Sequence, residues 1–203
     1  MIMIGRYELD AVTLAAAGAG LLAIVALLLL WRVYRQRRAR RLMLAAVTGG
    51  AFDFLHNVAL PDGQGGSLHF DFLLLTARGC VILDMRTVIG HIFGGDQMTE
   101  WTVMHRGTRS TFTNPQTSLY DRLACVRAIV AQLPVEGRVV FSPKGQFPKG
   151  LPRFTLMLAS VAAEFPPAER ERVRALPEAW RGDWERLRET CRPSPMIARR
   201  AAV

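Results

Sequence analysis

Two aspartates lie in a strongly apolar stretch of the sequence, at positions where their side chains could do chemistry. Residues 70–86 contain two apolar runs joined by the short segment 76–79, and each run carries one carboxylate, Asp71 or Asp84. Successive residues of a β-strand point to opposite sides. Asp71 therefore shares a strand face with His69, and Asp84 with Arg86. A tight turn between the strands would bring the two aspartates together on one face.

Two neighbouring carboxylates repel each other, and burying them without partners is unfavourable. A Mg²⁺ ion would remove this conflict, because it is commonly held by one or two carboxylates with water and substrate phosphate as its other ligands. Such an ion can polarise a phosphate and activate a water molecule. The alternative is a structural ion pair in which Arg86 neutralises Asp84 or Asp71. The spacing alone leaves both interpretations open.

The elements that position these residues follow an α/β order. Residues 38–47 have helical spacing that Gly49 and Gly50 should end. Three strands are expected at 52–60, 68–75 and 80–86, with a positive φ at Gly79 in the second turn. A small hairpin should turn near Arg106 and Gly107. A helix should begin near Pro115, with an apolar stripe of Leu119, Leu123, Val126 and Val130, and residues 138–142 should form a buried strand.

The C-terminal part, residues 151–203, reads as an extension that is largely helical. Residues 154–165 are apolar without a clear period, so their secondary structure stays undecided. Residues 166–191 favour helix, with interruptions expected near Pro177 and Gly182.

An uncharged apolar run at residues 11–30 is long enough to cross a hydrocarbon core of roughly 30 Å as a helix. Six arginines follow it between residues 32 and 41. Because positive segments near a span stay on the cytoplasmic side, the N-terminus is expected outside and the domain inside, at the inner (cell) membrane, with the lipid bilayer as a partner. The expected divisions are a tail at 1–10, a transmembrane helix at 11–31, a basic segment at 32–41, a domain at 42–150 and the extension.

The formal net charge of +9 has mainly a membrane explanation. Residues 42–190 carry 16 basic and 15 acidic groups, so the domain is nearly neutral, and the excess lies in the segment 32–41 and the last residues. This distribution gives little support to nucleic-acid binding. The three cysteines have no metal-binding spacing and should be reduced thiols in a cytosolic domain.

Taken together, residues 55–95 resemble the core of the nuclease-related domain (NERD) family, a branch of the PD-(D/E)XK nuclease fold. The matching landmarks are Asp71, Gly79, the triplet Asp84-Met85-Arg86, Gly90, Trp101 and Asn114-Pro115. The resemblance covers about residues 45–142. It implies a PD-(D/E)XK domain of order α-β-β-β-α-β, after a transmembrane helix of the kind common in such proteins.

The resemblance also implies a site. Asp71 and Asp84, with the Met85 carbonyl, would hold Mg²⁺ or Mn²⁺, Arg86 would stabilise the transition state, and the substrate would be DNA or RNA. Three departures count against this chemistry. Arg86 replaces the family's lysine and cannot readily orient or deprotonate a water, His69 replaces an acid, and residues 32–51 contain no acid at all.

These departures favour a degenerate site, in a membrane-tethered binding or scaffold module. The competing hypothesis is an active Mg²⁺-dependent nuclease.

Other polar residues carry less weight. His69 is expected to be an ordinary strand histidine or a partner of the metal ligands. Gln116 and Tyr120 share a helix face; such a pair lies near the metal in some related nucleases, but both are expected here to be polar residues of the helix surface. Lys144 and Lys149 belong to a loop that should be solvated.

Overall fold

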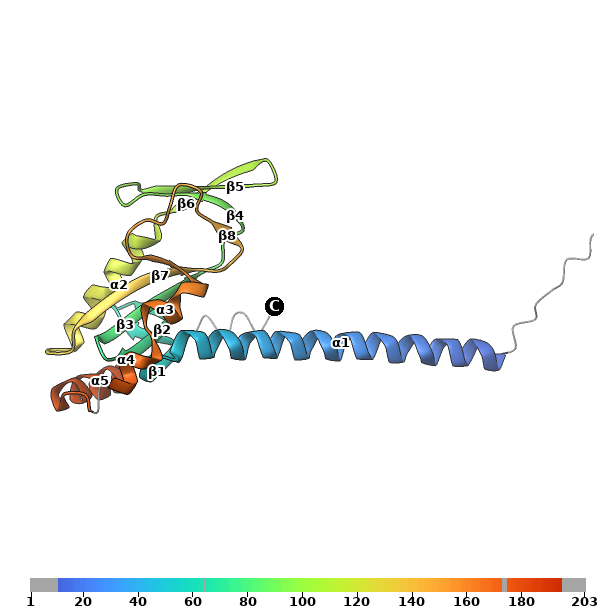
Figure 1. Cartoon of the computed structure of the whole chain (residues 1–203), viewed down its shortest axis with the longest axis horizontal. Helices are drawn as coiled ribbons and strands as arrows, with labels where there is room; N and C mark the ends of the chain where they lie inside the picture. Colours follow the sequence, from blue (N-terminus) through green and yellow to red (C-terminus); the bar gives the residue numbers. More distant parts are fainter. Residues whose placement is uncertain (1–10, 64, 173–174, 195–203) are drawn as a thin grey trace, which may run out of the picture. The chain divides into compact units, whose positions relative to one another are not determined.

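The computed structural model describes residues 11–63, 65–172 and 175–194, and these divide into two compact units, Met1–Ala45 and Ala46–Val203. All of the described part of the first unit belongs to α1, Ala11–Thr48 (Figure 1). The expected span, the basic segment and the helical residues 38–47 form this one continuous helix. As expected, the helix ends before Gly49 and Gly50.

The helix α1 is long and apolar enough, from Ala19 onward, to cross a membrane. Core helices of soluble proteins and signal sequences can pass the same test of length and composition. Here the side chains between residues 19 and 42 are exposed rather than packed in a core. Leu22, Leu27 and Leu30, for example, are 65–72% exposed.

The second unit is built on a six-stranded sheet of order β10-β1-β2-β3-β7-β9. The expected meander is confirmed as β1 (Ala51–Pro61), β2 (Ser67–Thr76) and β3 (Gly79–Arg86), which pair in antiparallel fashion. The expected fourth strand is β7 (Val135–Phe141), parallel to β3, and β9 (Thr155–Met157) extends the sheet parallel to β7. The short strand β10 (Arg192–Pro193) pairs with the other edge, at β1.

The turn between β2 and β3 requires a glycine. Gly79 has a φ of +121°, as expected, and a Cβ there would lie 2.4 Å from the carbonyl oxygen of Pro134. The close approach lets the Cys80 N–H donate to that carbonyl at 2.8 Å. This contact fixes the start of β3 beside the segment that leads into β7.

A second sheet of four strands has the order β6-β5-β4-β8. Its expected part is the hairpin of β5 (Glu100–His105) and β6 (Thr108–Thr113), which turns at Arg106 and Gly107. Both turn residues have positive φ, as a two-residue type I′ turn requires. The strands β4 (Gly90–Phe93) and β8 (Gly145–Gln146) were not expected from the sequence.

The helix α2 (Pro115–Ile129) begins where Pro115 predicts, and the Asn114 side chain caps it by accepting from the Gln116 N–H. Its apolar stripe is buried. It lies against β7, where Gly137 leaves room for Leu119: a Cβ on Gly137 would sit 2.7 Å from the Leu119 side chain. The core between helix and sheet also includes Trp101, Ile82 and Phe141, all almost fully buried.

The C-terminal residues belong to the second unit. The undecided stretch 154–165 divides into β9, a 3-10 turn at Leu158–Ser160 and the short helix α3 (Val161–Glu164). After α4 (Pro167–Arg172) comes α5 (Glu178–Thr190), which starts beyond Pro177 as expected. The expected interruption at Gly182 is wrong. The helix continues through it because Trp184 and Leu187, on the following turns, are buried in the main core.

Candidate functional site

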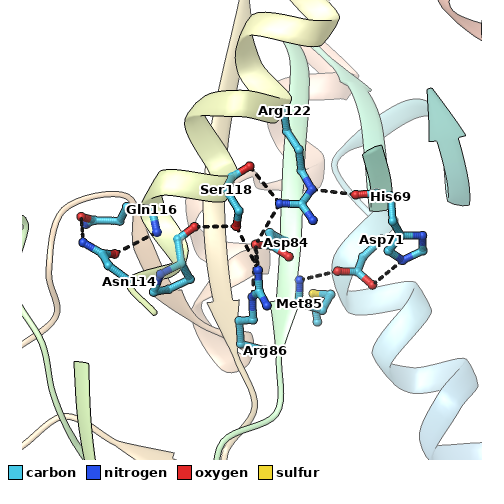
Figure 2. Close-up of polar contacts among 10 residues, drawn as sticks. His69, Asp71, Asp84, Met85, Arg86, Asn114, Gln116, Ser118 and Arg122 are labelled. Atoms are coloured by element: carbon cyan, nitrogen blue, oxygen red, sulfur yellow. Dashed lines mark hydrogen bonds and ion pairs between the residues drawn. The ribbon is translucent and has the colours of Figure 1, made fainter. Parts of the chain in front are cut away.

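The two aspartates of the opening hairpin lie where the strands β2 and β3 separate. The last pair of their ladder joins Phe72 and Leu83, so the next pair in register would be Asp71 opposite Asp84. There the ladder is replaced by a side-chain contact: the Met85 N–H donates to Asp71 Oδ2 at 2.8 Å (Figure 2). The sequence predicted that the two carboxylates share this region, and the structure places them there.

Asp84 is buried, with a side chain 3% exposed, and it is surrounded by guanidinium groups. Arg86 donates to Asp84 Oδ2 from Nε at 3.2 Å and from Nη2 at 2.7 Å. Arg122 Nη1 lies 3.6 Å from the same oxygen. The ion pair that the sequence offered as the alternative to a metal site is therefore present, with a second arginine in addition.

Arg122 is the site residue that the sequence interpretation missed. It projects from α2, with a side chain 12% exposed, and its Nε donates to the His69 carbonyl at 2.6 Å while Nη1 donates to the Ser118 carbonyl at 2.9 Å. The feature of the sequence that could have identified Arg122 is its position in α2, three residues after Leu119 and four before Val126. An arginine on the buried stripe of a helix needs an anionic partner in the core.

Ser118 joins the network from one turn earlier in α2. Its hydroxyl accepts from Arg86 Nη2 at 3.1 Å and donates to the Pro115 carbonyl at 3.0 Å. The arginine at the end of β3 is thereby fixed between the strand and the helix. Its side chain is nevertheless 36% exposed, so one part of the guanidinium faces solvent.

The pKa of Asp84 is raised above its ordinary value. Burial is the largest cause, the nearby Arg122 and Arg86 oppose it, and the charge of Asp71 adds to the rise. The two arginines thus offset the cost of burying this carboxylate only in part. The contribution of Asp71 also shows that the two acids lie close enough to influence each other.

His69 connects Asp71 to the C-terminal end of the described chain. Its Nε2 lies 3.3 Å from Asp71 Oδ1, and its Nδ1 lies 2.7 Å from Ser194 Oγ. The half-buried strand histidine is thus also a polar partner of Asp71. Both Asp71 oxygens therefore have partners within the protein, the His69 ring and the Met85 N–H.

Gln116 and Tyr120 do not join the aspartates. Gln116 is buried, so the expectation of a helix-surface residue is wrong for it. Its amide donates to Asp96 Oδ1 at 3.0 Å and to the Arg153 carbonyl at 2.6 Å, which ties two loops to the start of α2. Tyr120 is 53% exposed and packs edge-on against Phe154.

The donor set does not suit a divalent metal ion in this arrangement. Two carboxylates face two guanidinium groups, so the formal charge of the cluster is already balanced without a cation. Both Asp71 oxygens and Asp84 Oδ2 accept from protein donors. Within the described residues, moreover, no three His, Cys, Asp or Glu side chains gather as a metal-binding group. A metal ion at Asp84 Oδ2 would have to compete with both arginines for this oxygen.

Comparison with known proteins gives a family for this part of the chain. The model of the family described as "Nuclease-related domain" (NERD) matches residues 34–142, more than half of the chain. An uncharacterized protein of Bacillus anthracis is 23% identical over 115 residues, covering 56% of this chain and 54% of the relative. The chain thus spans about half the length of that relative.

No solved structure matches the chain significantly. The match to the family model includes every landmark of the hairpin site, from Asp71 to Arg86, and extends through α2 and β7. The chain is therefore a member of the nuclease-related domain family.

Proposed function

We propose that this chain is a single-pass membrane protein whose nuclease-related domain serves as a binding or scaffold module rather than as a metal-dependent nuclease. The observation that carries the proposal is the pairing of the buried Asp84 with both Arg86 and Arg122. A carboxylate already neutralised by two cations has little electrostatic reason to bind a third. The fold is retained in this proposal while the chemistry is lost.

The permanent charges of the two arginines support this proposal. A guanidinium keeps its proton at all physiological pH values, so neither arginine can leave Asp84 by becoming neutral. A metal ion at Asp84 would therefore compete with two permanently charged partners, and leaving this buried carboxylate without either of them would be costly.

The element order supports a PD-(D/E)XK-like domain. Helix α1, the meander β1-β2-β3, helix α2 and the parallel strand β7 follow the expected order α-β-β-β-α-β. Three strands of the second sheet, β4 to β6, are inserted between β3 and α2, and its fourth strand, β8, follows β7. The candidate site lies where β2 and β3 separate, and α2 contributes Arg122 to it. The proposed relationship to nucleases of this fold rests on the order of the helices and strands and on the place of the site among them.

The membrane part of the proposal is supported by α1 and its charge pattern. The uncharged run 11–30 is followed at once by six arginines, and the guanidinium of Arg35 lies 4.7 Å from the ring centre of Trp31. Aromatic and basic residues of this kind are typical of a bilayer interface. We propose an N-terminus outside the cell membrane and a cytoplasmic domain.

The second candidate function is an active nuclease that uses Mg²⁺ or Mn²⁺. It is favoured by one observation: Asp71 and Asp84 stand opposite each other at separating strand ends, as two metal ligands should. In this alternative the Met85 carbonyl would be a third ligand. Arg86, which is partly exposed, would stabilise the charge of the attacked phosphate.

Metal-dependent stability separates the two candidates. For a site with a dissociation constant near 1 mM, 5 mM Mg²⁺ would stabilise the folded state by about 1 kcal/mol, a rise of roughly 2–4 °C in melting temperature. We expect no such rise for the full-length chain in detergent, with Mg²⁺ or Mn²⁺. Asp71→Asn should lower the melting temperature equally with and without metal, because it weakens the contacts to Met85 and His69.

Nuclease activity is measured on the same samples, with single- and double-stranded DNA and RNA as substrates. The matched control is Asp121→Asn, which removes an exposed acid of α2 away from the cluster. A metal-dependent rise that Asp71→Asn abolishes, accompanied by cleavage, would establish the nuclease and refute the module.

A further inference from the structure

We propose that the solvent-facing side of the second sheet docks on an anionic lipid surface and gives the domain a membrane contact separate from α1. This side is called the outer face. Its central row crosses all four strands and consists of Gln146, His91, Met104 and Arg109, which are paired in register and exposed. The proposal rests on the membrane anchoring proposed above.

The sheet has two sides of different character. On the inner side, Ile92 and Trp101 are buried in the main core, and Val103 and Phe112 pack against it. On the outer face, Phe93 follows His91 at the next position of the same side, and Lys149 Nζ lies 6.0 Å from the centre of its ring. The outer face therefore combines cations with apolar side chains.

The β5–β6 hairpin carries this face outward. Every residue from Met104 to Thr111 is exposed, and the hairpin projects from the second unit in Figure 1. Its distal part contains Arg106 and Arg109 and no carboxylate. The nearest acid on the same side of β5 is Glu100, at the opposite end of the strand.

Ile89 adds an exposed apolar side chain immediately before β4, close to the hairpin strand β5. It is 48% exposed and immediately precedes Gly90, where a Cβ would lie 2.4 Å from the Met104 carbonyl oxygen. The Gly90 N–H also donates to the Lys144 carbonyl at 3.0 Å. These contacts hold the backbone of Ile89, Met104 and Lys144 close together.

Basic residues and exposed apolar side chains both gather in the segments that form the second sheet and its connecting loops. Residues 87–113 and 142–153 contain five basic and two acidic residues, although residues 42–190 as a whole are nearly neutral. Outside α1, the described residues include five exposed large hydrophobic side chains, and four of them lie in these segments: Ile89, Met98, Met104 and Leu151. The two properties coincide in one region.

This combination favours a lipid surface over a nucleic acid. A phosphate backbone attracts cations but offers no gain for exposed aliphatic side chains. An anionic bilayer attracts the cations through its surface potential and accepts the apolar side chains at the boundary of its headgroups. A domain held by one span also stays near the bilayer, so a weak surface contact is enough.

Amide hydrogen exchange of the full-length chain in lipid nanodiscs tests the proposal. One nanodisc contains only phosphatidylcholine, and the other contains about one third phosphatidylglycerol. We expect the amides of residues 103–110 to exchange roughly tenfold more slowly in the anionic nanodisc. Arg106→Gln/Arg109→Gln should remove most of this difference. The matched control, Arg127→Gln/Arg181→Gln, removes two exposed arginines elsewhere in the domain and should preserve it.

Three results would overturn the docking proposal. Equal exchange in the two nanodiscs excludes an anionic lipid contact. A difference that both double variants abolish equally assigns the effect to total charge. Protection of the hairpin by an added oligonucleotide in the neutral nanodisc, without protection by anionic lipid, makes the outer face a nucleic-acid surface. If the chain instead fails to enter nanodiscs and is washed from membranes by alkaline carbonate, the anchoring itself is refuted.

Discussion

At the scale of single residues, the partners of Asp84 determine what the site can do. A buried ion pair contributes little net stability compared with an apolar replacement, but breaking it by removing one partner is costly. Arg122 is the more buried of the two arginines and also binds the His69 and Ser118 carbonyls. It therefore connects β2, β3 and α2 through one side chain.

We predict that Arg122→Ala lowers the free energy of unfolding by about 3–5 kcal/mol, because it leaves Asp84 with one cation in a buried position. The corresponding fall in melting temperature is roughly 10 °C. Adding Asp84→Asn should recover part of the loss, since the buried carboxylate that has lost one of its two cations is then neutral. Arg127→Ala, an exposed arginine of the same helix, is the control. Equal losses for the two arginine variants, or no recovery in the double variant, would contradict the ion-pair interpretation.

Part of the candidate site could be predicted from the sequence. Strand periodicity placed Asp71 and Asp84 on one face, because a side chain's direction in a strand is fixed by its position. The arginine partners could not be assigned in the same way. Whether Arg86 binds Asp84 or Asp71, and whether Arg122 reaches either, depends on how α2 docks on the sheet, and no local pattern specifies that docking.

At the scale of elements, α5 secures the end of α2 through one carboxylate. Asp183 Oδ2 accepts from the N–H groups of Ala131, Gln132 and Leu133 at 3.0, 2.6 and 2.8 Å. Burial acts to raise the pKa of Asp183, but these hydrogen bonds and the contact with Arg186 outweigh it, and the net shift is downward. The carboxylate therefore stabilises the fold in its ionised form.

The sign of the pH dependence follows from that shift. Because the folded-state pKa lies below the unfolded one, the stabilisation is fully present above the unfolded pKa of about 3.9. It is lost as the pH falls through the folded value. We predict that Asp183→Asn lowers the free energy of unfolding by about 1–2 kcal/mol at pH 7, and that the difference shrinks below about pH 4.

Thermal unfolding of the unmodified chain and of Asp183→Asn between pH 7 and pH 3 measures this difference in the free energy of unfolding. Glu185→Gln, on the same helix with an exposed side chain, is the matched control and should change little at any pH. A difference between Asp183→Asn and the unmodified chain that stays constant down to pH 3 would exclude a contribution from the charge.

The elements themselves were predictable to different degrees. The meander, the hairpin at Arg106 and the start of α2 carry their own signals, namely alternation, turn residues and a cap. The strands β8, β9 and β10 are two or three residues long and exist only through their partners β4, β7 and β1. The continuation of α5 through Gly182 likewise depends on a tertiary effect, the burial of Trp184 and Leu187.

At the scale of the whole molecule, residues 151–194 complete the second unit. They supply an edge strand on each side of the six-stranded sheet, through β9 and β10. They also place Trp184 in the core, where its Nε1 donates to Asp53 at 2.9 Å. The part of the chain matched by the family model, which ends at residue 142, thus lacks elements that cover its own core.

We predict that a chain ending at Gly150 does not fold. It loses the buried Trp184 and Leu187, and removing a single large buried side chain already costs about 3–5 kcal/mol, a large part of the 5–15 kcal/mol that stabilises a typical domain. Limited proteolysis in membranes should degrade its domain rapidly. A chain ending at Ser194 retains every described element and should resist proteolysis as the full chain does. Equal resistance of the Gly150 chain would show that the C-terminal elements are dispensable.

The proposed orientation of α1 in a membrane also belongs to this scale, because it would decide which compartment contains the domain. The six arginines between residues 32 and 41 all follow the apolar run, whereas residues 1–10 carry one arginine and two acids. Positively charged residues close to a span are retained in the cytoplasm. We predict that a reporter fused after Val203 is active as a cytoplasmic fusion and silent as a periplasmic one.

Replacing four of the six arginines with glutamine should give a mixed orientation, because the charge bias that remains is weak. An active periplasmic reporter on the unmodified chain would place the domain outside the cytoplasm, where the outer face of the second sheet could not meet the anionic cytoplasmic leaflet.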